Sequence, residues 1–166
     1  MKMTRRENLA LLGGTLAAAT VPGALMAADE PKTVIVEMLN VDPDDKKQRQ
    51  IFKPAVVHVN VGDTVKFVPT DRGHNAEVDK KMMPEGGDEF AGKINKEVEV
   101  TFTTDGAYGY YCKPHRSVGM VGLVLVGDAA ASLEAAKEVK QRGKAKQRYK
   151  DYFAQADEIL AEAQSS

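Results

Sequence analysis

Short stretches in which apolar and polar residues alternate run along residues 33–126, with turn-forming residues between them. Residues 57–61 read Val-His-Val-Asn-Val, and residues 97–102 read Glu-Val-Glu-Val-Thr-Phe. A period of two directs apolar side chains to one face of a sheet, so these stretches predict half-buried strands. Several short strands separated by turns predict a mainly β protein built as a β-sandwich. The segments expected to form strands are 33–39, 57–61, 64–68, 97–102, 107–111 and 121–126.

The composition changes after Gly127, where alternation gives way to alanine-rich, helix-forming sequence. Asp128 can cap a first helix beginning at 129, and Gly143 separates it from a second helix expected over 144–162. Apolar residues recur at helical spacing in the second helix and predict packing against the sandwich rather than a partner-binding face. These residues are Tyr149, Tyr152, Phe153, Ala156, Ile159 and Leu160. We therefore expect a sandwich over 28–127 and a helical extension over 128–166.

The first 27 residues have the features of a signal peptide. Lys2, Arg5 and Arg6 precede a short apolar run over 9–21, and small residues follow it. The run is too short to span a bilayer, and no later segment is long and apolar enough. The Arg pair suits twin-arginine export, although general secretory export stays open. Cleavage near residue 27 or 28 would shift the net charge from −1 to about −3.

The only cysteine, Cys112, opens a short segment between two expected strands. His115 follows three residues later and Met120 closes the segment, while His74 follows another strand within Gly73-His74-Asn75. One thiolate, two imidazoles and one thioether are the ligands of a mononuclear blue-copper site. Soft sulfur suits Cu(I) and imidazole suits Cu(II), so one site serves both oxidation states. The set leaves no position for a substrate, which favours an electron carrier over an enzyme.

Other metal and thiol chemistries fit these residues less well. A closed zinc site would need a carboxylate or His58 as its fourth ligand. Covalent haem attachment needs two cysteines, and only Cys112 is present. A cysteine hydrolase would need a nearby histidine base and an orienting group, for which Asn75 is a candidate, but it would not require Met120.

Motifs along the chain resemble the cupredoxin family of type 1 blue-copper proteins, and within it the pseudoazurins. The matching segments are 37–40 (Glu-Met-Leu-Asn), 52–55 (Phe-Lys-Pro-Ala), 61–65 (Val-Gly-Asp-Thr-Val), 73–75, 83–86 (Met-Pro-Glu-Gly), 93–95 (Lys-Ile-Asn), 114–115 and 119–120. The resemblance implies a cupredoxin-like Greek-key sandwich, which here carries two C-terminal helices. Segment 41–50 is a departure, because it is charged and longer than the usual loop of the family.

The resemblance also implies roles for individual residues. His74, Cys112 and His115 would be equatorial copper ligands, and Met120 would be the axial ligand. Asn75 would donate its backbone N–H to the cysteine sulfur, while its side chain joins the ligand loops. Pro114 has no N–H, so it cannot donate a further hydrogen bond to the sulfur.

By the same resemblance, the protein would be a periplasmic carrier that passes single electrons in denitrification, and we expect it to be a monomer. Expected partners are copper nitrite reductase and c-type cytochromes, with no role for nucleic acid. A copper storage or delivery protein is the alternative, and it would need an open, exchangeable site. His115 would expose its ring edge, surrounded by an apolar patch of Pro114, Val118 and Met82.

Charged residues near the ligands predict a basic rim that would attract acidic partners. These residues are Arg72, Lys80, Lys81, Lys113 and Arg116, whereas the acidic group Asp42, Asp44 and Asp45 lies far away in sequence. His58 falls on the polar face of its strand, so we expect a surface residue and not a ligand.

Overall fold

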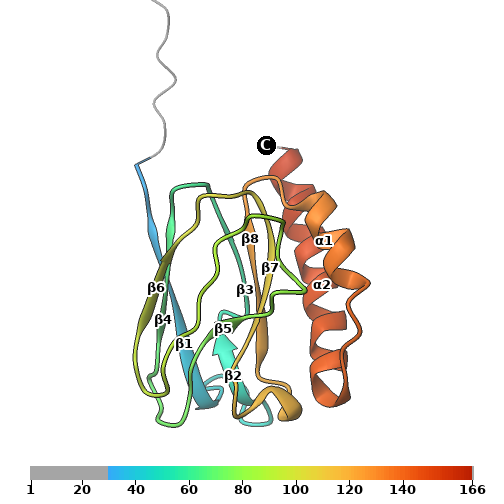
Figure 1. The fold of residues 1–166 in the computed structure, drawn as a ribbon. Helices are drawn as coiled ribbons and strands as arrows, with labels where there is room; N and C mark the ends of the chain where they lie inside the picture. The colour runs from blue at the N-terminus through green and yellow to red at the C-terminus, as the bar shows by residue number, and fades with distance from the viewer. Residues whose placement is uncertain (1–29, 166) are drawn as a thin grey trace, which may run out of the picture.

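The computed structural model describes residues 30–165 and consists of two packed β-sheets with two helices on one side (Figure 1). The first sheet has the order β2-β1-β4-β6 and the second has the order β3-β8-β7-β5. The strands are β1 (Thr33–Val41), β2 (Arg49–Lys53), β3 (Val56–Val59), β4 (Thr64–Val68), β5 (Glu77–Val78), β6 (Val98–Thr101), β7 (Gly106–Tyr111) and β8 (Val121–Val126). The predicted signal peptide lies outside the described residues.

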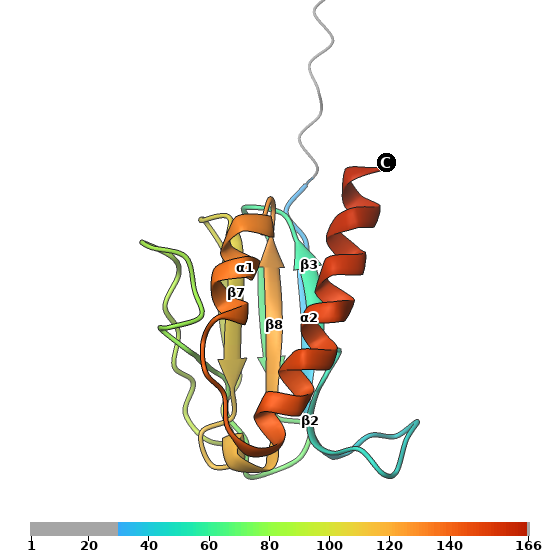
Figure 2. The ribbon, with the colours of Figure 1, turned by 90° about the vertical axis from the view of Figure 1, so that its right-hand side faces the viewer.

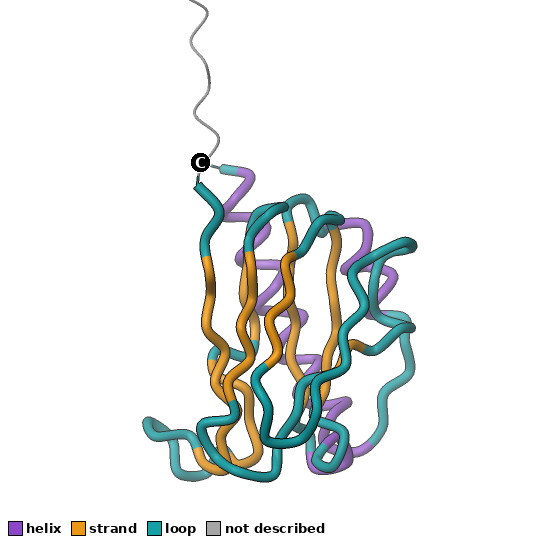
Figure 3. Tube along the Cα trace, turned by 60° about the vertical axis from the view of Figure 1, so that its left-hand side comes forward, coloured by secondary structure: helices purple, strands orange, loops and turns teal. Residues whose placement is uncertain are grey.

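Both sheets mix parallel and antiparallel pairing. Strand β1 runs parallel to β4, with Thr33 opposite Thr64, and antiparallel to β2. In the second sheet, β8 runs parallel to β3 and antiparallel to β7. Neighbours in a sheet are therefore often distant in sequence, as the prediction of a Greek-key sandwich requires. Figure 3 shows the strands in layers with the helices lying against one of them.

The core between the sheets is rich in aromatic rings. Phe52, Phe67 and Tyr110 come from three strands, and their ring centroids lie 4.7–6.4 Å apart in edge-on contacts. Edge-on packing suits the charge distribution of aromatic rings and adds to the stability from burial. Gly122 makes room for this cluster, because a Cβ atom there would lie 2.4 Å from the ring of Tyr110.

Strand β8 is buried along its whole length because both faces of its sheet are covered. Val124 and Val126 face the core between the sheets, while Leu123 and Leu125 pack beneath the helices. This double burial explains why the sequence of β8 is continuously apolar instead of alternating. Figure 2 shows the helices crossing the face formed by β3, β8 and β7.

The helices are α1 (Ala130–Lys137) and α2 (Gly143–Gln164), close to the predicted bounds. The N-cap residue of α1 is Ala129, one position after the predicted Asp128. The side chain of Asp128 still accepts the N–H of Ala130 at 3.4 Å. The predicted apolar stripe of α2 packs on the sheet, and the hydroxyl of Tyr149 donates to the carbonyl of Tyr110 at 3.0 Å. In the part of the chain that the structure describes, neither helix has the length and hydrophobicity needed to cross a bilayer.

Several details differ from the sequence prediction, among them the short strand β5, which was not expected. Strand β3 ends at Val59, and Val61 is exposed in the turn that follows, because the chain reverses at Gly62. The charged segment 41–50 contains the start of β2, which pairs with β1 through Val41 and Arg49. Only tertiary pairing, with Ile51 and Phe52 buried, reveals this second strand.

Candidate metal centre

The candidate ligand loop joins β7 to β8 at the lower end of the sandwich in Figure 1 and includes a short 3-10 helix, η1 (Arg116–Val118). Its backbone is closed by hydrogen bonds among the candidate ligands themselves. The N–H of Cys112 donates to the carbonyl of Met120 at 2.9 Å, and the N–H of Met120 donates to that of His115 at 3.0 Å. The N–H of His115 in turn donates to the carbonyl of Cys112 at 3.1 Å. The loop therefore holds three candidate ligands in a fixed arrangement.

Three metal-binding side chains converge at this loop. Their donor atoms, from His74, Cys112 and His115, all lie within 4.8 Å of one another. The sulfur of Cys112 is 3.5 Å from Nδ1 of His115 and 3.8 Å from Nδ1 of His74, and the two Nδ1 atoms are 3.1 Å apart. His74 reaches the group from the separate loop after β4.

The orientation of His74 is set on its far side. Its Nε2 lies 3.1 Å from Oδ1 of Asn40, an atom that can only accept, so Nε2 carries the proton. Nδ1 then has a free lone pair directed toward the sulfur, which is the form that binds a metal. Burial, together with the neighbouring charge of His115, lowers the pKa of His74 and keeps the ring neutral. Asn40 was not among the predicted site residues, although it ends a matched motif.

Cys112 is buried, and desolvation raises the pKa of its thiol. The backbone N–H groups of Asn75 and His115 oppose that rise, because they stabilise the thiolate. The side chain of Asn75 accepts the N–H of Lys113 at 2.8 Å and donates to the carbonyl of Gly92 at 2.9 Å. Asn75 thus connects the His74 loop to the residue after Cys112.

Met120 is fully buried, whereas Pro114 is exposed on the same loop. His115 is half-buried, while His74 and Cys112 are closed from solvent. A buried thiol with an imidazole nitrogen of His74 and one of His115 close to it, and a buried thioether on the same loop, form a donor set that fits copper.

The geometry argues against the competing chemistries. Among residues 30–165, the group of converging donors contains no carboxylate and does not include His58. The ring of His58 is partly buried and its Nε2 lies 3.1 Å from the carbonyl of Gly127, so the prediction of a surface residue is only partly right. A buried thiol with a raised pKa is also a poor nucleophile, which disfavours a cysteine hydrolase.

Comparison with known proteins decides the family. Residues 39–127 match the model of the copper binding proteins, plastocyanin/azurin family. This chain belongs to that family. It is 42% identical to a pseudoazurin of Methylorubrum extorquens over 87% of the chain and 94% of the relative, and 43% identical to a pseudoazurin of Paracoccus pantotrophus over 85% and 95%. The crystal structure of pseudoazurin from Methylobacterium extorquens AM1 superposes with a TM-score of 0.70 at 43% identity, covering 75% of this chain and 98% of that one.

Membership of the plastocyanin/azurin family makes copper the cofactor and confirms the predicted fold and pseudoazurin resemblance. The family consists of type 1 copper electron carriers, so the prediction that the chain is no enzyme is also confirmed.

The surface around His115 in this cupredoxin differs from the predicted apolar patch in one residue. Val118 is 42% exposed and Pro114 is exposed beside it. Met82, by contrast, is 1% exposed and packs between the second sheet and the helices, where its sulfur accepts from Nε2 of Gln141 at 2.9 Å. The prediction for Met82 was wrong because its turn folds inward against Gly109, where a Cβ atom would collide with Met82.

The expected basic residues divide into paired and exposed ones. Arg116 pairs with Asp79 at 2.5 Å and lies 4.2 Å from the ring centroid of Tyr111, and Lys80 pairs with Glu89. Arg72, Lys81 and Lys113 are exposed. Residues of the α1–α2 connection, which were not predicted to lie near the site, add to the basic surface. They contribute to a groove beside the ligand loop that is lined by Lys113, Arg116, Ser117, Lys140, Gln141, Arg142 and Ala145.

The acidic group lies closer to the site than its sequence position suggests. Asp42 and Asp44 belong to the β1–β2 hairpin, where both pair with Lys53 at 2.5–2.6 Å. The same hairpin contains Asn40, which contacts His74. Figure 2 shows this hairpin at the same end of the molecule as the ligand loop, so Asp42 and Asp44 belong to that end.

Proposed function

We propose that the chain is a periplasmic carrier of single electrons in denitrification, with copper held by His74, Cys112, His115 and Met120. The convergence of one sulfur and two Nδ1 atoms within 4.8 Å supports this assignment most directly. Bound copper would supply a one-electron couple between Cu(II) and Cu(I). The residues around it hold the donor atoms still, so that little rearrangement accompanies the exchange of an electron.

The proposed division of labour follows from burial and hydrogen bonding. His74 and Cys112 keep the site closed to water, and Met120 covers it from within the loop. Asn75 limits the thiolate's movement through its contact with Lys113. Pro114 follows Lys113 and offers no N–H to the sulfur, so the thiolate keeps its electron density for the metal.

His115 is the proposed electron port. Its Nδ1 lies 3.5 Å from the sulfur of Cys112, so the opposite edge of the ring points away from the donor group. It is also the least buried of the four proposed ligands. The exposed side chains of Pro114 and Val118 beside it suit a brief contact with a redox partner.

Long-range attraction would come from the exposed cations near this port. Lys113, Lys140 and Arg142 line one groove, and they would speed encounters with an acidic partner. We propose copper nitrite reductase or a c-type cytochrome as that partner, on the strength of the pseudoazurin resemblance. The rate of electron transfer to purified copper nitrite reductase should fall as salt rises. A rate that is independent of salt would contradict the steering role.

The first test is an optical spectrum of the purified protein with Cu(II), followed by ascorbate and then re-oxidation. An intense visible band that bleaches on reduction and returns on oxidation supports the carrier. Cys112→Ser should remove the band, because the colour depends on the thiolate bond to copper. A colourless protein with intact strands would reject the type 1 site.

The rate at which copper is lost to a chelator distinguishes an electron carrier from the predicted alternative, a copper storage or delivery protein. A carrier should retain copper in the presence of a chelator, because three of its four proposed ligands are buried. Rapid loss of copper to the chelator would favour delivery. The closed geometry supports the carrier.

Export, processing and assembly complete the proposal. We propose that residues 1–27 are a signal peptide, that residues 28–127 form the cupredoxin unit, and that residues 128–166 form its helical extension. The mature protein would be a periplasmic monomer. Fractionation of expressing cells, mass spectrometry of the N-terminus and light scattering test these statements in turn.

A further inference from the structure

Arg148 on helix α2 connects two separate parts of the molecule. Its Nη1 donates to the carbonyl of Gly119 at 2.7 Å and to the carbonyl of Gln50 at 2.6 Å. Its Nη2 donates to the carbonyl of Arg49 at 2.6 Å. One guanidinium therefore joins the end of the ligand loop to the β1–β2 hairpin, across sequence separations of 29 to 99 residues.

The contact with the ligand loop is made next to Met120. Gly119 has a φ of 94°, and a Cβ atom there would lie 3.0 Å from Cβ of Lys144 and 3.3 Å from Cδ of Arg148. Helix α2 thus lies directly against the backbone that precedes Met120. The N–H of Met120 donates to the carbonyl of His115, so a shift of Gly119 would move the thioether relative to the imidazole.

The contact with the hairpin leads to the other ligand loop. Gln50 has a φ of 51°, a left-handed conformation that a non-glycine residue keeps only when its surroundings hold it. Its Nε2 donates to Oδ1 of Asn40 at 3.4 Å, and the same oxygen accepts Nε2–H of His74. Arg148 holds the carbonyl of Gln50, and Gln50 contacts Asn40, the residue that orients His74.

The contacts with the hairpin are made to Arg49 and Gln50, at the end of the charged segment 41–50. A purely structural role for Arg148 would be to attach α2 to the sandwich. Tyr149, Ala156 and Leu160 already do this through burial, so the three carbonyl contacts are in excess of what docking requires.

We propose that Arg148 is a positioning residue for the copper site, acting on Met120 through Gly119 and on His74 through Gln50 and Asn40. This inference rests on the proposed ligand set. The planar guanidinium presents its donors to the three carbonyls from two nitrogens held in a fixed fork. An ammonium group presents its three donors from a single nitrogen on a flexible stem, so Arg148→Lys should not restore the function.

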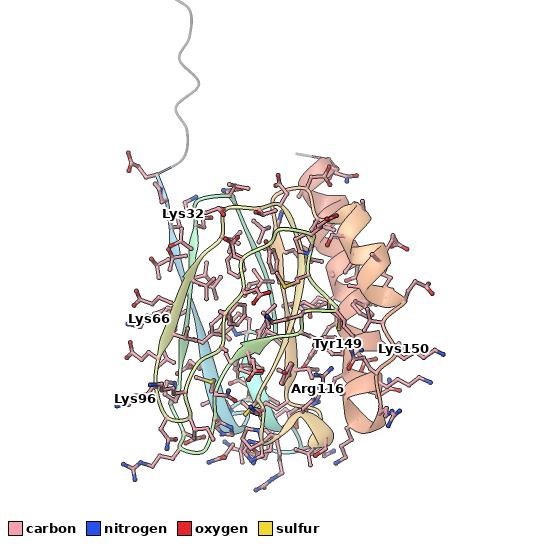
Figure 4. The ribbon with its side chains drawn as sticks, viewed as in Figure 1. Lys32, Lys66, Lys96, Arg116, Tyr149 and Lys150 are labelled. Atoms are coloured by element: carbon pink, nitrogen blue, oxygen red, sulfur yellow. The ribbon has the colours of Figure 1, made fainter. Side chains whose placement is uncertain are left out.

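The test compares Arg148→Met and Arg148→Lys with Lys150→Met. Lys150 is exposed two residues away on the same helix and points away from the sheet, in contrast to Tyr149 (Figure 4), so its variant removes the same charge without the contacts. Copper affinity, reduction potential and the ratio of the visible bands are measured for each. We expect Arg148→Met to lose roughly tenfold in copper affinity, with a changed band ratio and potential. Lys150→Met should match the wild type, and Arg148→Lys should resemble Arg148→Met.

Two further measurements keep the inference independent of folding and of the copper assignment. Gln50→Gly keeps the left-handed backbone but removes the amide, so it should change the same spectral features even if Arg148→Met is poorly folded. In the metal-free protein, hydrogen exchange of the Met120 amide should accelerate in Arg148→Met but not in Lys150→Met.

The outcomes separate the two proposals. A wild-type protein without a blue band would reject the ligand set, whereas the exchange result in the metal-free protein would still report on the contact itself. If the wild type is blue and the variants at Arg148 and Gln50 equal Lys150→Met in affinity, potential, band ratio and Met120 exchange, the positioning role is wrong.

Discussion

His74 donates its Nε2–H to Oδ1 of Asn40 at 3.1 Å, which leaves Nδ1 deprotonated and directed toward the sulfur of Cys112, 3.8 Å away. One hydrogen bond therefore selects the tautomer of a proposed ligand. It also connects strand β1, where Asn40 lies, to a loop more than thirty residues further along the chain. The site is prepared by the sandwich before any ion binds.

Replacing Asn40 tests this preparation. Asn40→Ala removes the acceptor, so the ring of His74 is free to change tautomer and to rotate. Copper affinity should fall by roughly 10- to 100-fold, as is usual when a ligand loses its supporting partner. Affinity is measured by competition with a chelator of known strength.

Asn40→Asp is the matched control, because it keeps an oxygen acceptor at the same place. It should bind copper more tightly than Asn40→Ala. Equal affinity in all three proteins would show that Asn40 does not orient His74.

Copper should stabilise the folded protein. The donor atoms converge only in the native state, so binding shifts the unfolding equilibrium by mass action. With free copper about a thousandfold above its Kd, the free energy of unfolding should rise by about 4 kcal/mol. Denaturant titrations with and without copper measure this difference. Cys112→Ser should gain much less, and an equal gain in that variant would argue for binding elsewhere.

Asp63 should make stability depend on acidity. Its carboxylate is buried in the turn before β4 and accepts the backbone N–H groups of Lys32 at 2.7 Å and Asn60 at 2.8 Å. These bonds, that of Lys32 first, lower the pKa of Asp63 below its usual value of 3.8. The stabilisation is therefore present above the pKa of the unfolded chain and is lost as the pH falls through the lower, folded pKa.

Asp63→Ala leaves both N–H groups without this acceptor and should cost about 1–3 kcal/mol at neutral pH. The cost should shrink toward acid, where the wild-type carboxyl is protonated as well. Urea unfolding of both proteins between neutral and strongly acidic pH gives the comparison. A difference that stays constant across this range would contradict the role assigned to the Asp63 charge.

Tyr149 tests how helix α2 is held. Its hydroxyl is buried and donates to the carbonyl of Tyr110 in β7, two residues before Cys112. Tyr149→Phe keeps the ring but removes the donor, and should lower the free energy of unfolding by about 1 kcal/mol. Tyr152→Phe, on a partly buried ring of the same helix, should change it by less than about 0.5 kcal/mol. Thermal unfolding of both variants checks the order.

Local pattern was sufficient for much of the fold. Residues 64–68 and 121–126 were predicted as strands with the bounds that the structure has, because their apolar and β-branched character is strong. The helix predicted over 144–162 from apolar residues at helical spacing is observed over 143–164. In these segments the residues that are buried in the structure are ones that are apolar in sequence, so the sequence pattern was enough to predict the element.

The misses share a physical cause. Strand β2 begins at the end of the charged segment 41–50, and only its pairing with β1 and the burial of Ile51 and Phe52 make it a strand. Met82 was placed at the surface because a methionine near a turn carries no sign of which way the turn folds. Packing decided both cases.

The sequence by itself determined which donor groups this protein offers: a single thiolate, histidines and a thioether at loop spacing, which are the residue types that suit copper. Tertiary structure alone decided how these groups are held. Asn40 and Arg148 act from a strand and a helix distant in sequence, and their importance arises from hydrogen-bond distances of about 3 Å that no local pattern encodes. Ligand identity is a property of residue types, whereas ligand orientation is a property of the packed sandwich.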